Sequence, residues 1–287
     1  MKVMLWIIFF IYSTCAALIF QKLLIPWLQG FQGVGGLIHG SDSVYFHQVA
    51  VELAESVRTS GWGTWTIWPA QGATGNVSFL AILYVFFGDH PSLMVPINAA
   101  MHATSGIIIL LIAQILRPGK VGVYSGTITA ILFIIFPSAL NWYAQIHKDG
   151  FVILGMLIIL YSWSKGIQHS LNVRACSWIV LGTLSGTSLV IFVRPYNIDL
   201  LVFLCALVCI ISFFYILLTK SLRNKHYLPI IFLFLTIALV TISTFMPKAD
   251  IVEDPKKLMV LEDPTWRWKK AVFSLIRSID FLKMRQK

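Results

Sequence analysis

Long apolar segments, each near the length needed to cross a bilayer, constrain this fold more than any other feature. A membrane-spanning helix needs about 20 mostly apolar residues. The sequence predicts such helices near residues 3–21, 92–116, 121–141, 150–165, 176–193, 197–219 and 228–246. Only 12% of the 287 residues are charged, against roughly 25% in ordinary soluble domains. We therefore predict an all-α polytopic transmembrane helix bundle over residues 1–246, with about seven spans.

The charge distribution indicates a membrane protein rather than one that binds nucleic acid. The formal net charge is +10, but the basic residues lie in short loops and in the tail. Such placement is expected for membrane orientation and contact with anionic lipids. The first apolar segment could be a signal peptide, but it lacks a clear cleavage site and further spans follow. We therefore expect this first segment to be an uncleaved helix. In the third predicted span, 121–141, we expect a kink at Pro137.

The short apolar segment 76–88 decides the topology. It could be a span or a helix at the outer surface. If it does not cross and the N-terminus is cytoplasmic, eight basic residues before the tail lie inside and four outside. If it crosses, three lie inside and nine outside. The tendency of basic residues to stay inside favours the first arrangement, in which 29–91 is an outer loop with surface helices. We expect the plasma (inner) membrane as the location.

The tail, residues 247–287, begins with polar and proline-containing sequence and ends in a basic segment. Apolar residues share one helical face of that segment, which predicts an amphipathic helix at the membrane interface. The topology above leaves this helix outside.

Asp42 is the first candidate for chemistry. Ser41 or Asp42 can cap a helix that runs to about residue 58. Apolar residues follow at helical spacing, namely Tyr45, Phe46, Val49, Ala50, Leu53, Ala54 and Val57. Such a helix would rest on the membrane or on the bundle. Asp42 could be only a helix cap, or it could be a general base or metal ligand held above the bundle.

Three ionisable residues, His147, Lys148 and Asp149, lie between two apolar segments. Lys148 could extend to water, and Asp149 could cap the following helix. Alternatively, the three residues line a polar cavity. Asp149 and Asp42 could then share a divalent metal ion, while Lys148 neutralises a phosphate.

The segment "VRPYN" follows a later span and opens on the same predicted outer side. Arg194 lies at a predicted helix C-terminus, where a cation is favourable, because Pro195 stops the helix. Its planar guanidinium could instead bind phosphate. No Walker loop, Rossmann glycine motif, HExxH or nucleophile elbow is present, so soluble nucleotide donors are unsupported.

The order of these polar segments resembles the N-terminal part of the GT-C type of membrane glycosyltransferases, which use polyprenyl-phosphate sugars. "GSDSVYFHQVAVELA" is similar to their first outer loop, and "FPSALNWYAQIHKDGFVILGMLIILY" resembles their second outer loop. "NVSFLAILYVFFGDHPSLMVPINAAMHATSGIIILLIAQIL" resembles the surface helix and span between these loops. "VRPYN" resembles a later arginine segment. This chain has the single acid Asp42 in place of an adjacent Asp-Asp or Asp-Glu pair, and it has fewer spans than that family usually has.

The resemblance implies a sugar transfer at the outer membrane face. Asp42 would be the catalytic base or a metal ligand, and Asp149 the second acid. Lys148 and Arg194 would hold the donor phosphate, with His147 and Tyr196 also in the substrate site. The partners would be a polyprenyl-phosphate sugar, a glycan, lipid or protein acceptor, and the bilayer. Two alternatives are a transporter or flippase-like component of polysaccharide assembly and a non-catalytic membrane subunit.

Overall fold

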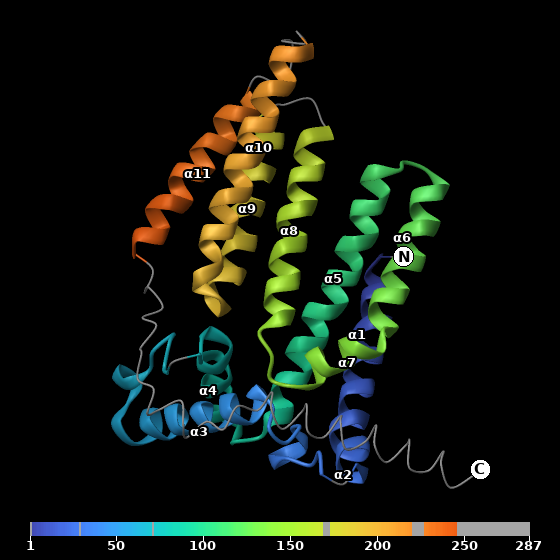
Figure 1. The fold of residues 1–287 in the computed structure, drawn as a ribbon. Helices are drawn as coiled ribbons and strands as arrows, with labels where there is room; N and C mark the ends of the chain where they lie inside the picture. The colour runs from blue at the N-terminus through green and yellow to red at the C-terminus, as the bar shows by residue number, and fades with distance from the viewer. Residues whose placement is uncertain (1, 29, 71, 169–172, 220–226, 246–287) are drawn as a thin grey trace, which may run out of the picture. The chain divides into compact units, whose positions relative to one another are not determined.

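The computed structural model describes residues 2–28, 30–70, 72–168, 173–219 and 227–245, which contain helices and turns but no β-strand (Figure 1). The predicted tail, 247–287, lies outside this part of the chain. The α-helices are α1 (Lys2–Ile19), α2 (Ile25–Trp27), α3 (Asp42–Ser60), α4 (Gly75–Phe87), α5 (Val95–Leu116), α6 (Lys120–Ile135), α7 (Pro137–Ala144), α8 (Asp149–Gln168), α9 (Val173–Val193), α10 (Ile198–Thr219) and α11 (Tyr227–Phe245). A π-helical turn, η1 (Phe20–Leu24), joins α1 to α2, and the 3₁₀ turns are η2 (Val34–Gly36), η3 (Trp62–Thr64), η4 (Pro91–Met94) and η5 (Pro195–Asn197).

The described residues form a multi-pass membrane protein, as predicted. Six helical segments are long and apolar enough to cross a bilayer, namely Lys2–Trp27, Pro91–Leu116, Asp149–Ile167, Arg174–Val193, Pro195–Tyr215 and Tyr227–Phe245. The pair α6 and α7 makes a seventh if it is one span, bent by 62°. The bend confirms the predicted kink. It arises because Pro137 has no N–H to donate and forces Phe136 before it into an extended conformation.

The helices α8 and α9 pack with their backbones in close contact. A Cβ atom added to Gly186 would lie 2.4 Å from the Gly155 carbonyl oxygen, and one added to Gly155 would lie 2.6 Å from the Gly186 oxygen. Small residues permit such approach between membrane helices. The two helices are joined at one end by residues 169–172, so this contact fixes how their other ends meet.

The helices α3 and α4 form a separate layer at one end of the spans, which we call the α3 end. Figure 1 shows α3 lying across the lower end of the upright helices. The α4 helix packs mainly on α3, and its N-terminus meets the end of α9, where Gly75 lies against the Phe192 backbone. With 13 residues, α4 is too short to cross a bilayer comfortably.

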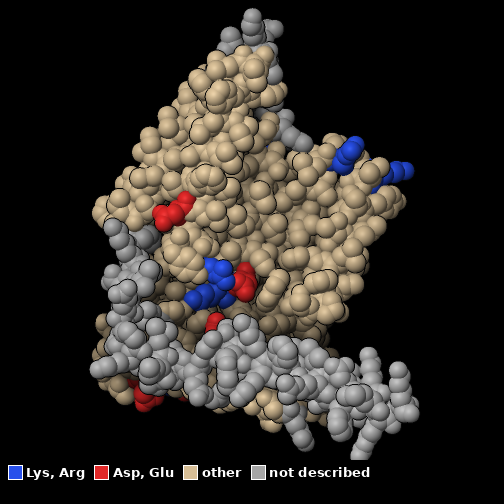
Figure 2. All heavy atoms as spheres, viewed as in Figure 1, with Lys and Arg blue, Asp and Glu red and all other residues tan. Residues whose placement is uncertain are grey.

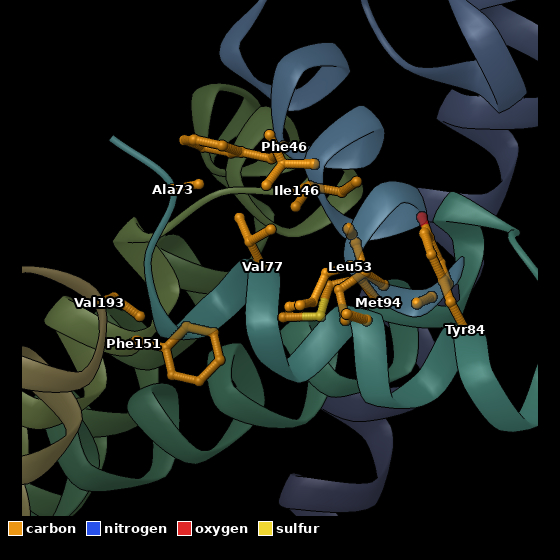
Figure 3. Close-up of a cluster of buried hydrophobic side chains, with 14 of the residues drawn as sticks. Phe46, Leu53, Ala73, Val77, Tyr84, Met94, Ile146, Phe151 and Val193 are labelled. Carbon is orange, nitrogen blue, oxygen red and sulfur yellow. The ribbon is translucent and has the colours of Figure 1, made fainter. Parts of the chain in front are cut away.

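Burial of one face of α3 and α4 makes the largest core cluster at this end of the bundle (Figure 3). Phe46 and Leu53 come from α3, and Val77 and Tyr84 from α4. The cluster also includes Met94, Ile146, Phe151 and Val193, which belong to η4, the α7–α8 connection, α8 and α9. The predicted apolar stripe of α3 is therefore its buried face, and it anchors the layer to the spans.

Candidate functional site

The connection between α7 and α8, which carries His147 and Lys148, is held by buried amide side chains. Gln145 is 1% exposed; its Oε1 accepts from the Ile38 N–H at 2.9 Å, and its Nε2 donates to the Gly36 carbonyl at 3.2 Å. Asn98 Nδ2 donates to the Gln145 carbonyl at 2.8 Å, and Gln21 Nε2 donates to the Ala144 carbonyl. Residues from η1, α5 and the segment before α3 therefore fix this connection.

The same connection positions the start of α3. The buried Ser43 hydroxyl donates to the Ile146 carbonyl at 3.3 Å. Its neighbour Asp42, the first residue of α3, is exposed, and no described group donates a hydrogen bond to its carboxylate. The carboxylate nevertheless acts electrostatically on His147 and Lys148, so the three side chains lie near one another.

Lys148 reaches the loop that precedes α4. Its Nζ donates to the Gly72 carbonyl and lies 4.9 Å from the centre of the Phe46 ring. That loop is attached to the end of α9, because the Thr74 hydroxyl donates to the Val193 carbonyl at 2.8 Å. Lys148 thus connects the α3–α4 layer to the ends of the spans.

Arg194 and Asp149 form an ion pair across the open end of the α8–α9 hairpin. The distance from Arg194 Nη2 to Asp149 Oδ1 is 2.6 Å, and both side chains are about one-third exposed, 33% and 32%. Asp149 begins α8 and Arg194 follows α9, so each charge also suits its helix terminus. The predicted helix-terminal roles, Asp149 at the start of α8 and Arg194 at the end of α9, therefore fit the structure. The ion pair between the two residues was not predicted from the sequence.

Burial lowers the pKa of both His147 and Lys148. Desolvation lowers the pKa of His147, outweighing the opposite effect of Asp149 and Asp42. Desolvation also lowers the pKa of Lys148, with a further contribution from the positive charge of Arg194, while the two carboxylates oppose the change. His147 is therefore neutral at pH 7.

We call Asp42, His147, Lys148, Asp149 and Arg194 the charged cluster. Its two carboxylates and two cations cancel in formal charge. Figure 2 shows basic and acidic atoms side by side at one place on a face that is otherwise largely uncharged. Tyr196, in η5, is 56% exposed, and no hydrogen bond, ion pair or ring contact within the described chain joins it to the cluster.

The donor set does not fit a divalent metal ion well. No group of three or more His, Cys, Asp and Glu side chains that could hold a metal is found among the described residues. Asp149 is already paired with Arg194, and the positive charge of Lys148 lies beside both carboxylates. We therefore assign no step to a metal shared by Asp42 and Asp149.

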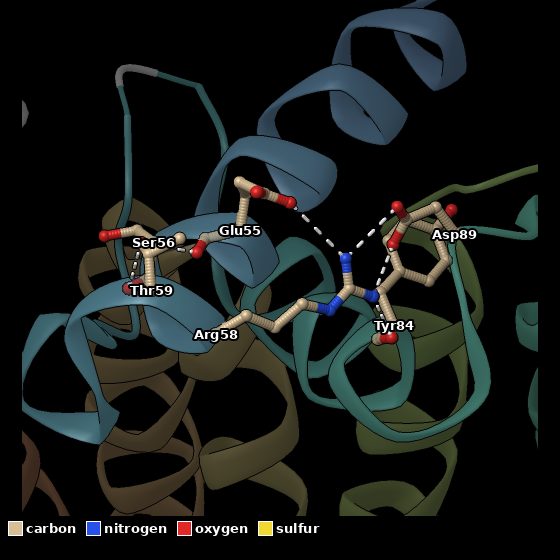
Figure 4. A network of polar contacts seen from close by, with 6 residues as sticks. All are labelled: Glu55, Ser56, Arg58, Thr59, Tyr84 and Asp89. Atoms are coloured by element: carbon tan, nitrogen blue, oxygen red, sulfur yellow. Dashed lines mark hydrogen bonds and ion pairs between the residues drawn. The ribbon is translucent and has the colours of Figure 1, made fainter.

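A second polar network, which sequence analysis did not identify, fixes the far end of the α3–α4 layer (Figure 4). Arg58, near the end of α3, pairs with Asp89 at 2.9 Å and with Glu55 at 3.6 Å. It also donates to the Tyr84 carbonyl in the last turn of α4. In the core beneath, His47 Nδ1 lies 2.7 Å from the Tyr84 hydroxyl. A sequence signal existed, since Arg58 lies near the end of one helix and Asp89 follows the next, but the pairing depends on the fold.

Comparison with protein-family models, with curated proteins and with solved structures found no match to this chain. The geometry of the charged cluster is therefore the main guide to function.

Proposed function

We propose that this protein is an integral membrane glycosyltransferase that takes a sugar from a polyprenyl phosphate. The observation that carries the proposal is the position of Asp42. Its carboxylate is exposed and free of hydrogen-bond donors from the described chain, and it acts electrostatically on Lys148, on which Arg194 also acts. An accessible base in a cluster that contains two cations suits a reaction in which a hydroxyl loses a proton and a phosphate leaves.

In the proposed reaction, Asp42 accepts the proton of the acceptor hydroxyl. The hydroxyl oxygen forms a bond to the anomeric carbon as the bond from that carbon to the lipid phosphate breaks. Lys148 and Arg194 stabilise the negative charge that the leaving phosphate gains. His147 is neutral and available to hydrogen-bond the substrate, and the exposed Tyr196, two residues after Arg194 in the chain, would be a further contact to the substrate. Asp149 acts as the residue that orients the guanidinium of Arg194.

The proposed orientation puts the α3 end outside the plasma membrane and the N-terminus in the cytoplasm. Six acidic residues belong to segments at the α3 end, namely Asp42, Glu52, Glu55, Asp89, Asp149 and Asp199. The same segments also carry four basic residues, Lys22, Arg58, Lys148 and Arg194, so the formal charge of the described residues at the α3 end is −2. Segments at the other end carry Arg117, Lys120, Lys165 and Arg174 and no acid within the described ranges, so that end is positively charged. Basic residues favour the cytoplasmic side. The acceptor would be an envelope glycan, lipid or protein.

The test is sugar transfer from a panel of polyprenyl-phosphate sugars by the full chain in proteoliposomes. Asp42→Asn removes the base while keeping the size and shape of the side chain, so transfer should fall by about 10²-fold or more. Glu52→Gln is the matched control, because Glu52 lies on the same helix and is exposed but outside the charged cluster. Undiminished transfer by the Asp42→Asn protein would remove Asp42 from the chemistry.

A non-catalytic or transporter-like role in polysaccharide assembly is the second candidate. The observation that favours it is the Asp149–Arg194 ion pair. This pair holds the open end of the α8–α9 hairpin together, so both residues have a structural role that needs no substrate. In that case no sugar transfer is measured with any donor, and Asp42→Asn leaves the cellular phenotype of the wild-type chain. Asp149→Ala would then act only through lower stability of the protein.

A further inference from the structure

A small cavity lies between α5, α7 and α8. Its volume is about 10 Å³. That is near the ~10–15 Å³ in which a single water molecule fits, and too small for a sugar or a lipid headgroup. The residues that line it are Asn98, His102 and Ser105 of α5, Trp142 and Tyr143 of α7, and Gly150 and Ile153 of α8.

Asn98, which lines this cavity, has a buried hydrogen-bond acceptor. The residue is 3% exposed, and its Nδ2 donates to the Gln145 carbonyl at 2.8 Å and more weakly to the Tyr143 carbonyl at 3.4 Å. Two carbonyl partners identify that end of the amide as the nitrogen. The other end, Oδ1, is buried and has no partner among the described residues. An amide oxygen can only accept hydrogen bonds.

His102, one turn along α5, presents the second acceptor. The residue is 8% exposed, and its ring lies 4.6 Å, centre to centre, from the rings of both Phe133 and Tyr143. Its Nε2 is buried and has no partner within the described ranges. A cationic ring inside a membrane span would need a charged partner, and no ion pair in the described chain includes His102. In a neutral imidazole, one ring nitrogen is an acceptor.

We infer that this cavity binds one water molecule, which donates one hydrogen to Asn98 Oδ1 and the other to His102 Nε2. The two lone pairs of the water then remain for donors such as the Ser105 hydroxyl, which lines the same cavity. The water links α5 to the α7–α8 connection, because Asn98 also holds the Gln145 carbonyl. The site does not depend on the proposed glycosyltransferase activity.

Solid-state NMR of the full chain in bilayers, with ¹⁵N-labelled histidine, tests this inference. The ring stacking suggests that His102→Phe keeps the fold, so the signals lost in that variant identify His102. We expect a neutral ring with an unprotonated Nε2, and polarisation transfer from water protons to that nitrogen. A protonated Nε2, an imidazolium spectrum, or the absence of transfer from water would each overturn the inference.

A cavity-filling variant gives an independent comparison. Ser105→Val replaces the hydroxyl with a methyl group and adds a second one, which should exclude the water and abolish the transfer to His102. Thr104→Val is the matched control, because Thr104 is the neighbouring residue and bonds Trp6 and Ala100 instead of lining the cavity. Transfer to His102 that persists in a folded Ser105→Val protein would place the water contact elsewhere and refute this site.

Discussion

Substituting Gly186 with alanine tests the close contact between α8 and α9. The new Cβ would lie 2.4 Å from the Gly155 carbonyl oxygen and 2.6 Å from Ile159 Cγ1. Carbon atoms in favourable contact lie ~3.5–4 Å apart. The oxygen belongs to the backbone and Ile159 is 1% exposed, so neither can turn aside. Relief therefore requires the helices to separate by about 1 Å.

The expected cost of Gly186→Ala is about 1–3 kcal/mol, the usual range for overpacking. For a chain of this size, that corresponds to a fall in melting temperature of roughly 2–12 °C. The assay is thermal unfolding of the purified chain in detergent, followed by tryptophan fluorescence. Because Asp149 and Arg194 close the open end of the same hairpin, the variant should also weaken their ion pair.

Gly150→Ala is the matched control, since Gly150 is also helical but its added Cβ would meet only Met101 Cε, at 3.4 Å. That variant should retain the wild-type melting temperature or raise it slightly, because alanine is a better helix former than glycine. Equal melting temperatures for Gly186→Ala and the wild type would refute backbone contact between α8 and α9.

Three further predictions concern the α3 end. Burial lowers the pKa of His47 in the folded protein, so the unfolded chain binds the proton more readily and stability should fall as pH drops below about 6.5; His47→Phe should reduce this slope in pH-dependent melting. A double-mutant cycle of Asp149→Ala and Arg194→Ala should give a coupling of about 0.5–1 kcal/mol by chemical denaturation, because the pair is partly exposed; zero coupling would contradict the pairing. Arg58→Ala removes the contacts with Asp89 and α4, so limited proteolysis after residue 87 should become faster while the spans stay intact.

Much of the fold could be predicted from the sequence because bilayer thickness and helix geometry fix the length of each apolar segment. The predicted helix that ended near residue 58 is α3, and the proline at 137 breaks the third span as expected. The segment 76–88 was ambiguous by length alone. Its place in the layer at the α3 end follows from packing against α3.

The candidate site could be predicted only in outline. Topology alone predicted that Asp42 and the His147–Asp149 segment share one end of the bundle, and the structure places them there. The Asp149–Arg194 pair could not be predicted, because it depends on how α8 and α9 pack. The supporting contact of Gln21 was also missed, because nothing in the local sequence indicates that its partner is the Ala144 carbonyl.

The hydrogen bonds of Gln145 have a consequence for biogenesis. Its contact with Ile38 joins residues 107 positions apart in the chain. During translation, α3 leaves the ribosome long before its partners in α7, α8 and α9 exist. The N-terminal half must therefore wait at the translocon or the membrane surface with only α4 packed on the apolar stripe of α3. A chain interrupted before residue 194 would never assemble the complete cluster.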